Sequence, residues 1–205
     1  MANFVRNDIR FIGNDKVDDC MREIVLRLRM DNEPNDTHGT GKIGRVLYGL
    51  SGDDAFLSYD EIGGKWIYFE YEDDERLTVT TGWDPARKFQ DYLLEKLVTL
   101  DPNVIISMRY DDESPRFVGV RYVLMDDMEI QSYERELDTS EYTIVGLEDV
   151  EEKKQELAQE DSESEVISWD DFWDKQSELL AEAYDELKAD YPQAYKDPAL
   201  RWREK

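Results

Sequence analysis

The sequence is poor in cysteine, histidine and basic residues. It has one cysteine, Cys20, and one histidine, His38, so an internal disulfide framework and a histidine-rich metal site are excluded. Its 25 Lys and Arg residues stand against 50 Asp and Glu residues, which gives a formal net charge of −25. Such a charge repels the phosphate backbone of nucleic acids, so we expect no direct nucleic-acid partner.

Long apolar runs are also missing. No stretch approaches the ~18 residues that a membrane-spanning helix needs, and the N-terminus lacks the apolar segment of a signal peptide. We therefore expect a cytoplasmic protein with no membrane partner.

What the 205 residues do contain is enough apolar material for a core. Hydrophobic residues make up 40% of the chain and aromatic residues 12%, which excludes wholesale disorder and fits one domain with an appendage. The acidic excess is uneven: residues 1–50 hold eight acids and eight bases, whereas residues 151–205 hold 17 acids and eight bases. The first quarter of the chain is therefore neutral, and the excess lies after it.

Hydrophobic periodicity predicts an α+β domain over residues 1–137. Over residues 4–12 the residues alternate: Val5, Ile9 and Phe11 are expected to face one side of a strand while Arg6, Asp8 and Arg10 face the other. Strands are predicted over residues 4–12, 66–71, 77–81, 104–110, 117–125 and 128–137, and helices over 17–30 and 85–100. The order predicts a ferredoxin-like βαββαββ antiparallel sheet with two helices on one face.

Three turn features accompany these elements. Asp15 is expected to cap the first helix, and Asp84 is expected to cap the second with Pro85 at its first position. Asp111 and Asp112 are expected in a turn, as are the acidic pairs at 53–54, 60–61 and 126–127, because aspartate side chains bond to local backbone.

Beyond residue 137 the composition changes. Residues 138–166 are predicted to form an acidic linker or a solvated helix, and residues 167–205 an acidic amphipathic helical extension. Ser168 and Asp171 have the spacing of a capping box. The aromatic face of this helix either docks onto the sheet or is an exposed anchor for a partner.

The first two-thirds of the chain, Met1–Leu137, carries motifs of a known family. They are Ala2-Asn3 before an Arg-Asn-rich strand, Gly63-Gly64-Lys65-Trp66, Thr81-Gly82-Trp83-Asp84-Pro85, and Tyr110-Asp111-Asp112-Glu113 followed by Phe117-Val118-Gly119. This part resembles the ferredoxin-like domain of the Api92-like/YubB-type proteins of phages, plasmids and bacterial mobile elements. The chain departs from that family in its opening, Asn3-Phe4-Val5, and in its extra C-terminal part. The resemblance implies a fold and an origin in a phage or another mobile element, and it implies no catalytic role.

The motifs that could carry chemistry are few. Residues 39–44 satisfy a GxGxxG pattern but lack the preceding strand that a dinucleotide site needs, so a plain loop is the preferred interpretation. No set of residues points to catalysis, a metal or a cofactor, and the sequence favours a protein that is not an enzyme.

Three functional hypotheses remain. The leading one is an accessory protein that binds and inhibits a host protein with a basic surface, such as a nucleic-acid-handling or defence factor, as a partial DNA mimic. Its predicted contact residues lie in the C-terminal helix: Trp169, Asp170, Asp171, Trp173, Asp174 and Glu178. The second is a small-ligand or nucleotide-processing enzyme that uses Lys65, Trp66 and Trp83. The third is a phage structural or assembly protein that forms a homodimer through the C-terminal helix.

Overall fold

The structure is a computed structural model that describes residues 3–30, 65–70, 76–113, 116–159 and 164–200. The residues of the GxGxxG pattern, His38 and the acidic pairs at 53–54 and 60–61 lie outside this part of the chain. Predictions for them stay as stated.

A six-stranded antiparallel sheet forms the centre of the molecule, with the strand order β2-β3-β1-β4-β5-β6. The alternation of apolar and polar residues that predicts these strands sets their two faces. The strands are β1 (Phe4–Ile12), β2 (Lys65–Glu70), β3 (Leu77–Gly82), β4 (Ile105–Asp112), β5 (Phe117–Asp126) and β6 (Glu129–Asp138). The α+β prediction is confirmed, and so is the strand predicted over residues 128–137.

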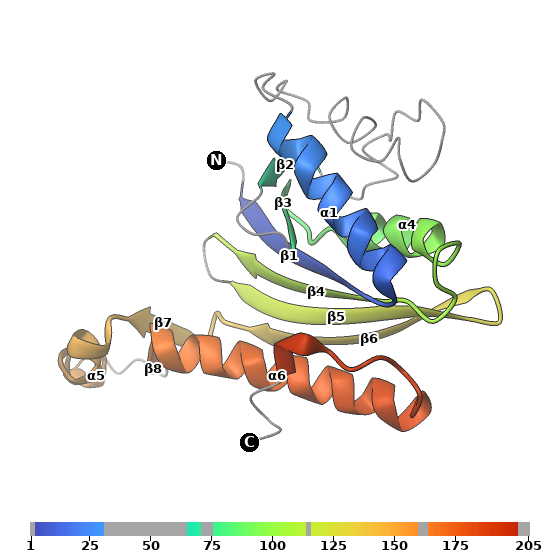
Figure 1. Ribbon diagram of the computed structural model, residues 1–205. Coiled ribbons are helices and arrows are strands. Elements are labelled where there is room, and N and C mark those ends of the chain that lie inside the picture. Colours follow the sequence, from blue (N-terminus) through green and yellow to red (C-terminus); the bar gives the residue numbers. More distant parts are fainter. Residues whose placement is uncertain (1–2, 31–64, 71–75, 114–115, 160–163, 201–205) are drawn as a thin grey trace.

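Helices cover the sheet on both faces. Helices α1 (Asp15–Met30) and α4 (Arg87–Leu97) lie on one face, and α6 (Trp169–Asp190) lies on the other (Figure 1). Val17, Phe89 and Leu93 are fully buried in the larger core, beneath α1 and α4. A second core forms where Leu180, Ala183 and Leu187 of α6 pack against β5 and β6. The C-terminal helix therefore docks onto the sheet, while Trp169 and Trp173 at its start are each 43% exposed, so each alternative holds for part of its aromatic face.

The chain between the sheet and α6 is ordered into elements that the sequence does not predict. Strands β7 (Tyr142–Val145) and β8 (Glu165–Ser168) form a small parallel pair. Between them lie a 3-10 turn, η1 (Leu147–Asp149), and helix α5 (Val150–Gln159). The helical alternative for the acidic stretch thus holds over α5. The capping box of α6 is confirmed, because Ser168 Oγ accepts from Asp171 N at 3.0 Å and Asp171 accepts from Ser168 N at 3.2 Å.

Two predicted helix caps are wrong. Helix α1 is preceded by Asn14, whose side-chain oxygen accepts from Lys16 N at 2.9 Å, so Asn14 takes the role predicted for Asp15. Helix α4 begins at Arg87 rather than at Pro85. Trp83 adopts a left-handed backbone conformation with φ of 77°, which turns the chain before the helix starts.

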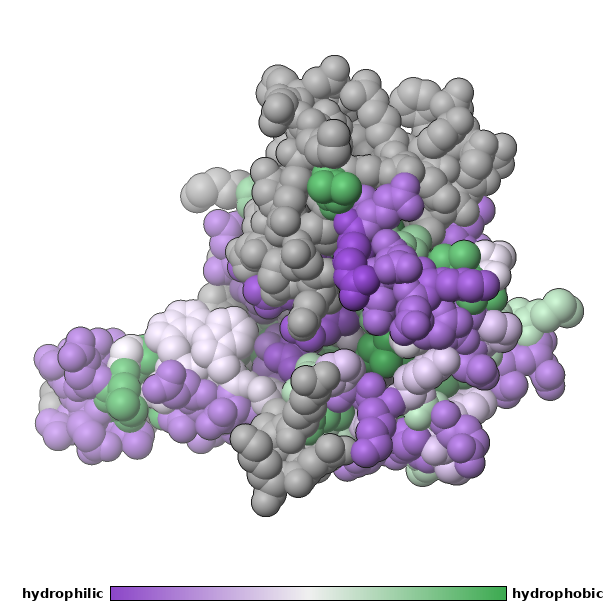
Figure 2. All heavy atoms as spheres, in the orientation of Figure 1, coloured by the Kyte–Doolittle hydropathy of each residue, from purple (hydrophilic) through white to green (hydrophobic). Residues whose placement is uncertain are grey.

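The acidic pair Asp111 and Asp112 also lies elsewhere than predicted. Both residues belong to β4 and not to a turn, because β1 extends far enough to pair with them, with Arg6 opposite Asp111 and Val5 opposite Asp112. Within the described residues, no helix is long and apolar enough to cross a membrane. On the face of the molecule seen in Figure 2, hydrophilic residues dominate the coloured surface and hydrophobic residues form small separate patches.

Candidate functional site

Charged side chains gather on one half of the sheet face that α6 shares. Arg6, Asp8 and Arg10 alternate along β1 with residues buried on the other face. In the register of β1 and β4, Asp8 lies opposite Arg109 and Arg6 lies opposite Asp111. Opposite charges directly across an antiparallel pair stabilise its register. The polar face predicted for β1 is therefore one side of a cross-strand array of charges.

Helix α6 covers only the apolar half of this face. Val120, Tyr122 and Leu124 of β5 are buried against it, and the rings of Tyr122 and Tyr184 lie 5.6 Å apart. An apolar helix stripe packs where it removes apolar area from water, and the charged side chains of β1 and β4 offer little such area. The helix consequently leaves the charged half as the floor of a cavity.

This cavity, which we call the arginine pocket, has a volume of about 570 Å³. Four arginines line it, together with three aspartates: Arg6, Arg10, Arg76, Arg109, Asp8, Asp111 and Asp197. The lining therefore carries a net positive charge in a protein whose total charge is −25. A local excess of arginine against that background is the main electrostatic anomaly of the described structure.

Asp8 holds two of the arginines in place. Its carboxylate is 3.4 Å from Arg6 Nε and 3.3 Å from Arg76 Nη1, and it accepts a hydrogen bond from Thr78 Oγ1 at 2.8 Å. A carboxylate shared between two guanidinium groups fixes both without neutralising both. Asp8 therefore preorganises Arg6 and Arg76 on the floor of the pocket.

Arg109 is the least compensated cation of the pocket. It is half-buried, and among the residues that the structure describes no carboxylate lies within ion-pair distance of its guanidinium. Burial lowers the pKa of Arg109, and the positive charge of Arg10 lowers it further, while Tyr122 and Asp197 oppose this change. A half-buried guanidinium without an ion pair is costly to hold and is a ready partner for an added anion.

Two aspartates of the pocket, Asp111 and Asp197, compete only weakly with a bound anion for Arg109. Burial raises the pKa of Asp111 to about 6. The positive charge of Arg6 lowers this pKa, whereas the nearby carboxylates of Asp8 and Asp112 raise it. Asp197 is buried and accepts a short hydrogen bond from the Tyr122 hydroxyl. Neither carboxylate pairs directly with Arg109, so this guanidinium stays available to a ligand.

The wall of the pocket comes from the first turns of α6. Trp173, Gln176 and Ser177 line it, and Trp173 is 43% exposed. Trp169 stacks on Trp173 at 6.3 Å between ring centroids with 26° between the planes. The capping box fixes the start of the helix that carries both rings. The wall therefore presents one aromatic surface and two polar side chains above an arginine floor.

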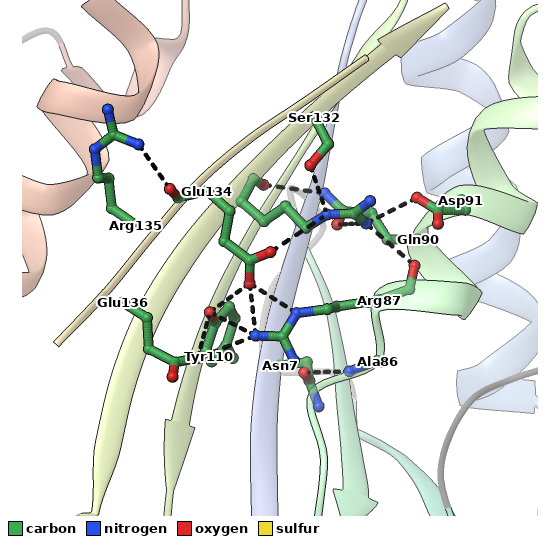
Figure 3. A network of polar contacts seen from close by, with 11 residues as sticks. Asn7, Ala86, Arg87, Gln90, Asp91, Tyr110, Ser132, Glu134, Arg135 and Glu136 are labelled. Carbon is green, nitrogen blue, oxygen red and sulfur yellow. Dashed lines mark hydrogen bonds and ion pairs between the residues drawn. The ribbon is translucent and has the colours of Figure 1, made fainter. Parts of the chain in front are cut away.

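A second group of arginines lies on the opposite face of the sheet and differs in its charge balance. We call it the closed cluster, and Figure 3 shows most of it. Arg87 donates to Glu134 at 2.7 Å, to Glu136 at 3.0 Å and to the Tyr110 hydroxyl at 3.1 Å. The Tyr110 ring lies directly over Gly119, where a Cβ atom would be 2.3 Å from the ring.

Arg121 completes the closed cluster from β5. Its Nη1 atom donates to Asp91 at 2.8 Å, to Gln90 at 2.9 Å and to the Arg87 carbonyl at 3.2 Å. Two arginines thus meet three carboxylates, so the protein itself supplies the balancing negative charge. The closed cluster ties α4 to the edge strand β6, and this charge balance makes it structural.

The residues predicted to bind a partner occupy the outer part of α6. Every acidic residue of the helix is exposed: Asp170, Asp171, Asp174, Glu178, Glu182, Asp185, Glu186 and Asp190. Trp169 and Trp173 are each 43% exposed. Asp171 is committed to the capping box, and hydrogen bonds with Ser168 lower its pKa. The structure brings Trp173 alone of this set into the arginine pocket.

The alternative ligand set is not gathered into that pocket. The side chains of Lys65 and Trp66 lie outside the described part of the structure, and Trp83 is 49% exposed on the turn before α4. Among the described residues no group of His, Cys, Asp and Glu side chains is arranged to hold a metal ion.

Sequence reasoning missed the arginine pocket, although part of its signal was present. Arg6, Asp8 and Arg10 show the period of a strand, and so do Ser107, Arg109 and Asp111. Only the pairing of β1 with β4 reveals that the two polar rows share one face. Comparison of the chain with protein-family models, with curated proteins and with solved structures finds no match.

Proposed function

We propose that this protein binds a small anionic ligand in the arginine pocket. The observation that carries the proposal is the half-buried Arg109, which has no ion pair among the described residues and lies in a cavity with three further arginines. A phosphate or carboxylate supplies the missing negative charge and matches the donor geometry of guanidinium groups. The cavity volume of about 570 Å³ falls in the range of small-molecule sites.

The overall charge makes this proposal easy to test. A protein of net charge −25 repels anions everywhere except at a local concentration of positive charge. Isothermal titration calorimetry with inorganic pyrophosphate is the direct experiment. We expect one site per chain, with an affinity that falls steeply as ionic strength rises.

Two arginine variants of equal charge locate the site. Arg109→Met removes the central cation, and we expect at least a tenfold loss of pyrophosphate affinity. Arg116→Met is the matched control, because Arg116 is exposed, pairs with Asp112 and does not line the pocket. An equal loss in both variants, or no binding by the wild type, would contradict the proposal.

A second candidate function is protein binding through α6, as the sequence predicts. Its support is the spacing of the exposed acids, because six of them recur at every fourth residue: Asp170, Asp174, Glu178, Glu182, Glu186 and Asp190. Such a row forms a ridge that winds around a helix of 22 residues, because each four-residue step advances about 40° around the axis, and Trp169 and Trp173 lie at its start. We propose that a host protein with a basic surface docks on this ridge.

Poly-L-lysine is a suitable probe of the acidic ridge. A triple variant that neutralises Asp170, Asp174 and Glu178 to the corresponding amides should weaken its binding more than a control triple variant on η1 and α5. The control neutralises Glu148, Glu151 and Glu152, which are also exposed. Equal losses would show that binding follows net charge, which contradicts a specific role of α6.

The strand order supports a finer description of the core. Along the chain, β1, α1 and β2 form one strand–helix–strand unit, and β3, α4 and β4 form a second. In the sheet order β2-β3-β1-β4 the strands of the two units are interleaved. We propose on this basis that the core is a ferredoxin-like sandwich to which β5 and β6 are added at one edge.

A further inference from the structure

The arginine pocket has more room than a simple anion fills. A water molecule occupies about 30 Å³ of liquid volume, and an inorganic phosphate is only a few times larger. The cavity of about 570 Å³ therefore accepts an anion together with an organic group of considerable size. The question is what chemistry that organic group has.

The wall of the pocket answers this question. Trp173 is 43% exposed and lies on the cavity, with Trp169 stacked on it to fix the indole plane. A large exposed indole beside a cationic floor offers a stacking surface for a planar ring. Gln176 and Ser177, one turn further along α6, supply an amide and a hydroxyl at the same wall.

We propose that the ligand of the arginine pocket is a nucleotide, with its base stacked on Trp173 and its phosphate groups on the arginine floor. This inference rests on the proposed function and names the ligand class. A nucleotide combines a planar base, a polar sugar and charged phosphates, which match the aromatic, polar and cationic side chains that line the pocket. Gln176 and Ser177 bind polar edges of the base or sugar.

The charge around the pocket selects a mononucleotide over a strand of nucleic acid. The helix that supplies the wall also carries eight exposed acids along its length. A strand that continues past the pocket along α6 would place its phosphates against those carboxylates, which repel them. A ligand confined to the pocket avoids this repulsion.

Calorimetry with four ligands tests the assignment on the wild-type protein. The ligands are ADP, pyrophosphate, ribose 5-phosphate and adenosine. We expect ADP to bind about tenfold more tightly than pyrophosphate or ribose 5-phosphate, because only ADP adds a stacked base to the phosphates. Adenosine should bind at least tenfold more weakly than ADP, because it lacks phosphate.

Two tryptophan variants then locate the base. Trp173→Leu should reduce the advantage of ADP over pyrophosphate to about twofold, whereas Trp83→Leu is the matched control, because Trp83 is similarly exposed and lies outside the pocket lining. In the wild type, ADP should quench tryptophan fluorescence and pyrophosphate should not, and this measurement needs no variant that might fold poorly.

The outcomes separate the two proposals. If pyrophosphate binds as tightly as ADP, the nucleotide assignment is wrong and the proposed anion site stands. If Trp83→Leu and Trp173→Leu have the same effect, the base does not stack on Trp173 and the assignment is also wrong. If no phosphate-bearing ligand binds, both proposals are overturned.

Discussion

Two groups of arginines on opposite faces of one sheet show how differently the same side chain is used. In the closed cluster, Arg87 and Arg121 meet Glu134, Glu136 and Asp91 at distances of 2.6–3.0 Å for the direct pairs. In the arginine pocket, four arginines share three aspartates around a cavity of about 570 Å³. The first group has more acids than bases and the second has more bases than acids.

The difference shows that the balance of charges and the presence of a cavity, rather than the presence of arginine, distinguish a structural ion-pair cluster from a binding site. Where carboxylates of the protein balance the arginines, their interactions stabilise the fold. Where a half-buried cation such as Arg109 has no ion pair among the described residues, its interaction energy is reserved for a ligand.

The largest expected contrast is in stability. Arg121→Met should lower the free energy of unfolding by about 3 kcal/mol, because it leaves Gln90 and Asp91 without their buried partner. Arg109→Met should change it by less than about 1 kcal/mol, because no ion pair is broken. Urea unfolding followed by circular dichroism measures both values. Similar losses in the two variants would remove the distinction between structural ion-pair cluster and binding site.

Neutralising one acid in each group should have opposite consequences. Asp8→Asn removes a negative charge from the pocket but keeps a side-chain oxygen that can accept hydrogen bonds from Arg6 and Arg76, so we expect pyrophosphate affinity to rise about tenfold. Asp91→Asn weakens the pair with Arg121 and should cost about 1–2 kcal/mol of stability without a change in pyrophosphate affinity. Calorimetry and urea unfolding of both variants test the contrast, and a weaker pyrophosphate complex in Asp8→Asn would contradict it.

A smaller effect is expected from pH. The pKa of Asp111 is raised to about 6, so this residue becomes negatively charged as pH rises through that value. It faces Arg6 and Asp8 from β1 and has Asp112 beside it. Sulfate, whose charge is constant over this range, should bind about fivefold more tightly at pH 5 than at pH 7.5.

The variant Asp111→Asn is the control for that experiment. It should flatten the pH profile of sulfate binding between pH 5 and pH 7.5. The same residue should favour the folded state most at low pH, and this contribution is lost as pH rises towards 6, because folding raises its pKa. A pH profile that persists in Asp111→Asn would assign the effect to another group.

The smallest effect concerns the wall of the pocket. Ser168→Ala removes the hydroxyl of the capping box and should lower the free energy of unfolding by about 0.5–1 kcal/mol. Because Trp173 lies in the second turn of a helix that is also held by its packing on β5, pyrophosphate affinity should change by less than twofold. A larger loss of affinity would show that the cap positions the wall.

Much of the fold could be predicted from local patterns. The strands over 4–12 and 117–125 follow from alternation, and α6 follows from its 3.6-residue apolar stripe and the Ser168–Asp171 capping box. The start of α4 could not be predicted, because the turn at Trp83 and the contact of Asn7 with the Ala86 amide depend on packing of β1. Strands β7 and β8 were missed because each has only four residues.

The candidate site was less accessible to sequence reasoning. The predicted contact residues of α6 are exposed, yet only Trp173 of that set also lies on the pocket. The arginines come from residues 6, 10, 76 and 109, which are separated by up to about a hundred positions in the chain. Their convergence needs the pairing of β1 with both β3 and β4.

The amino-acid sequence alone determined the strong negative charge, the α+β class and the amphipathic character of α6, because each depends on composition or on contacts a few residues apart. The tertiary structure decided which arginines are balanced by nearby carboxylates and which are not. That outcome depends on the register of β1 against β4 and on the position at which α6 docks. Both are set by long-range packing, which no local pattern encodes.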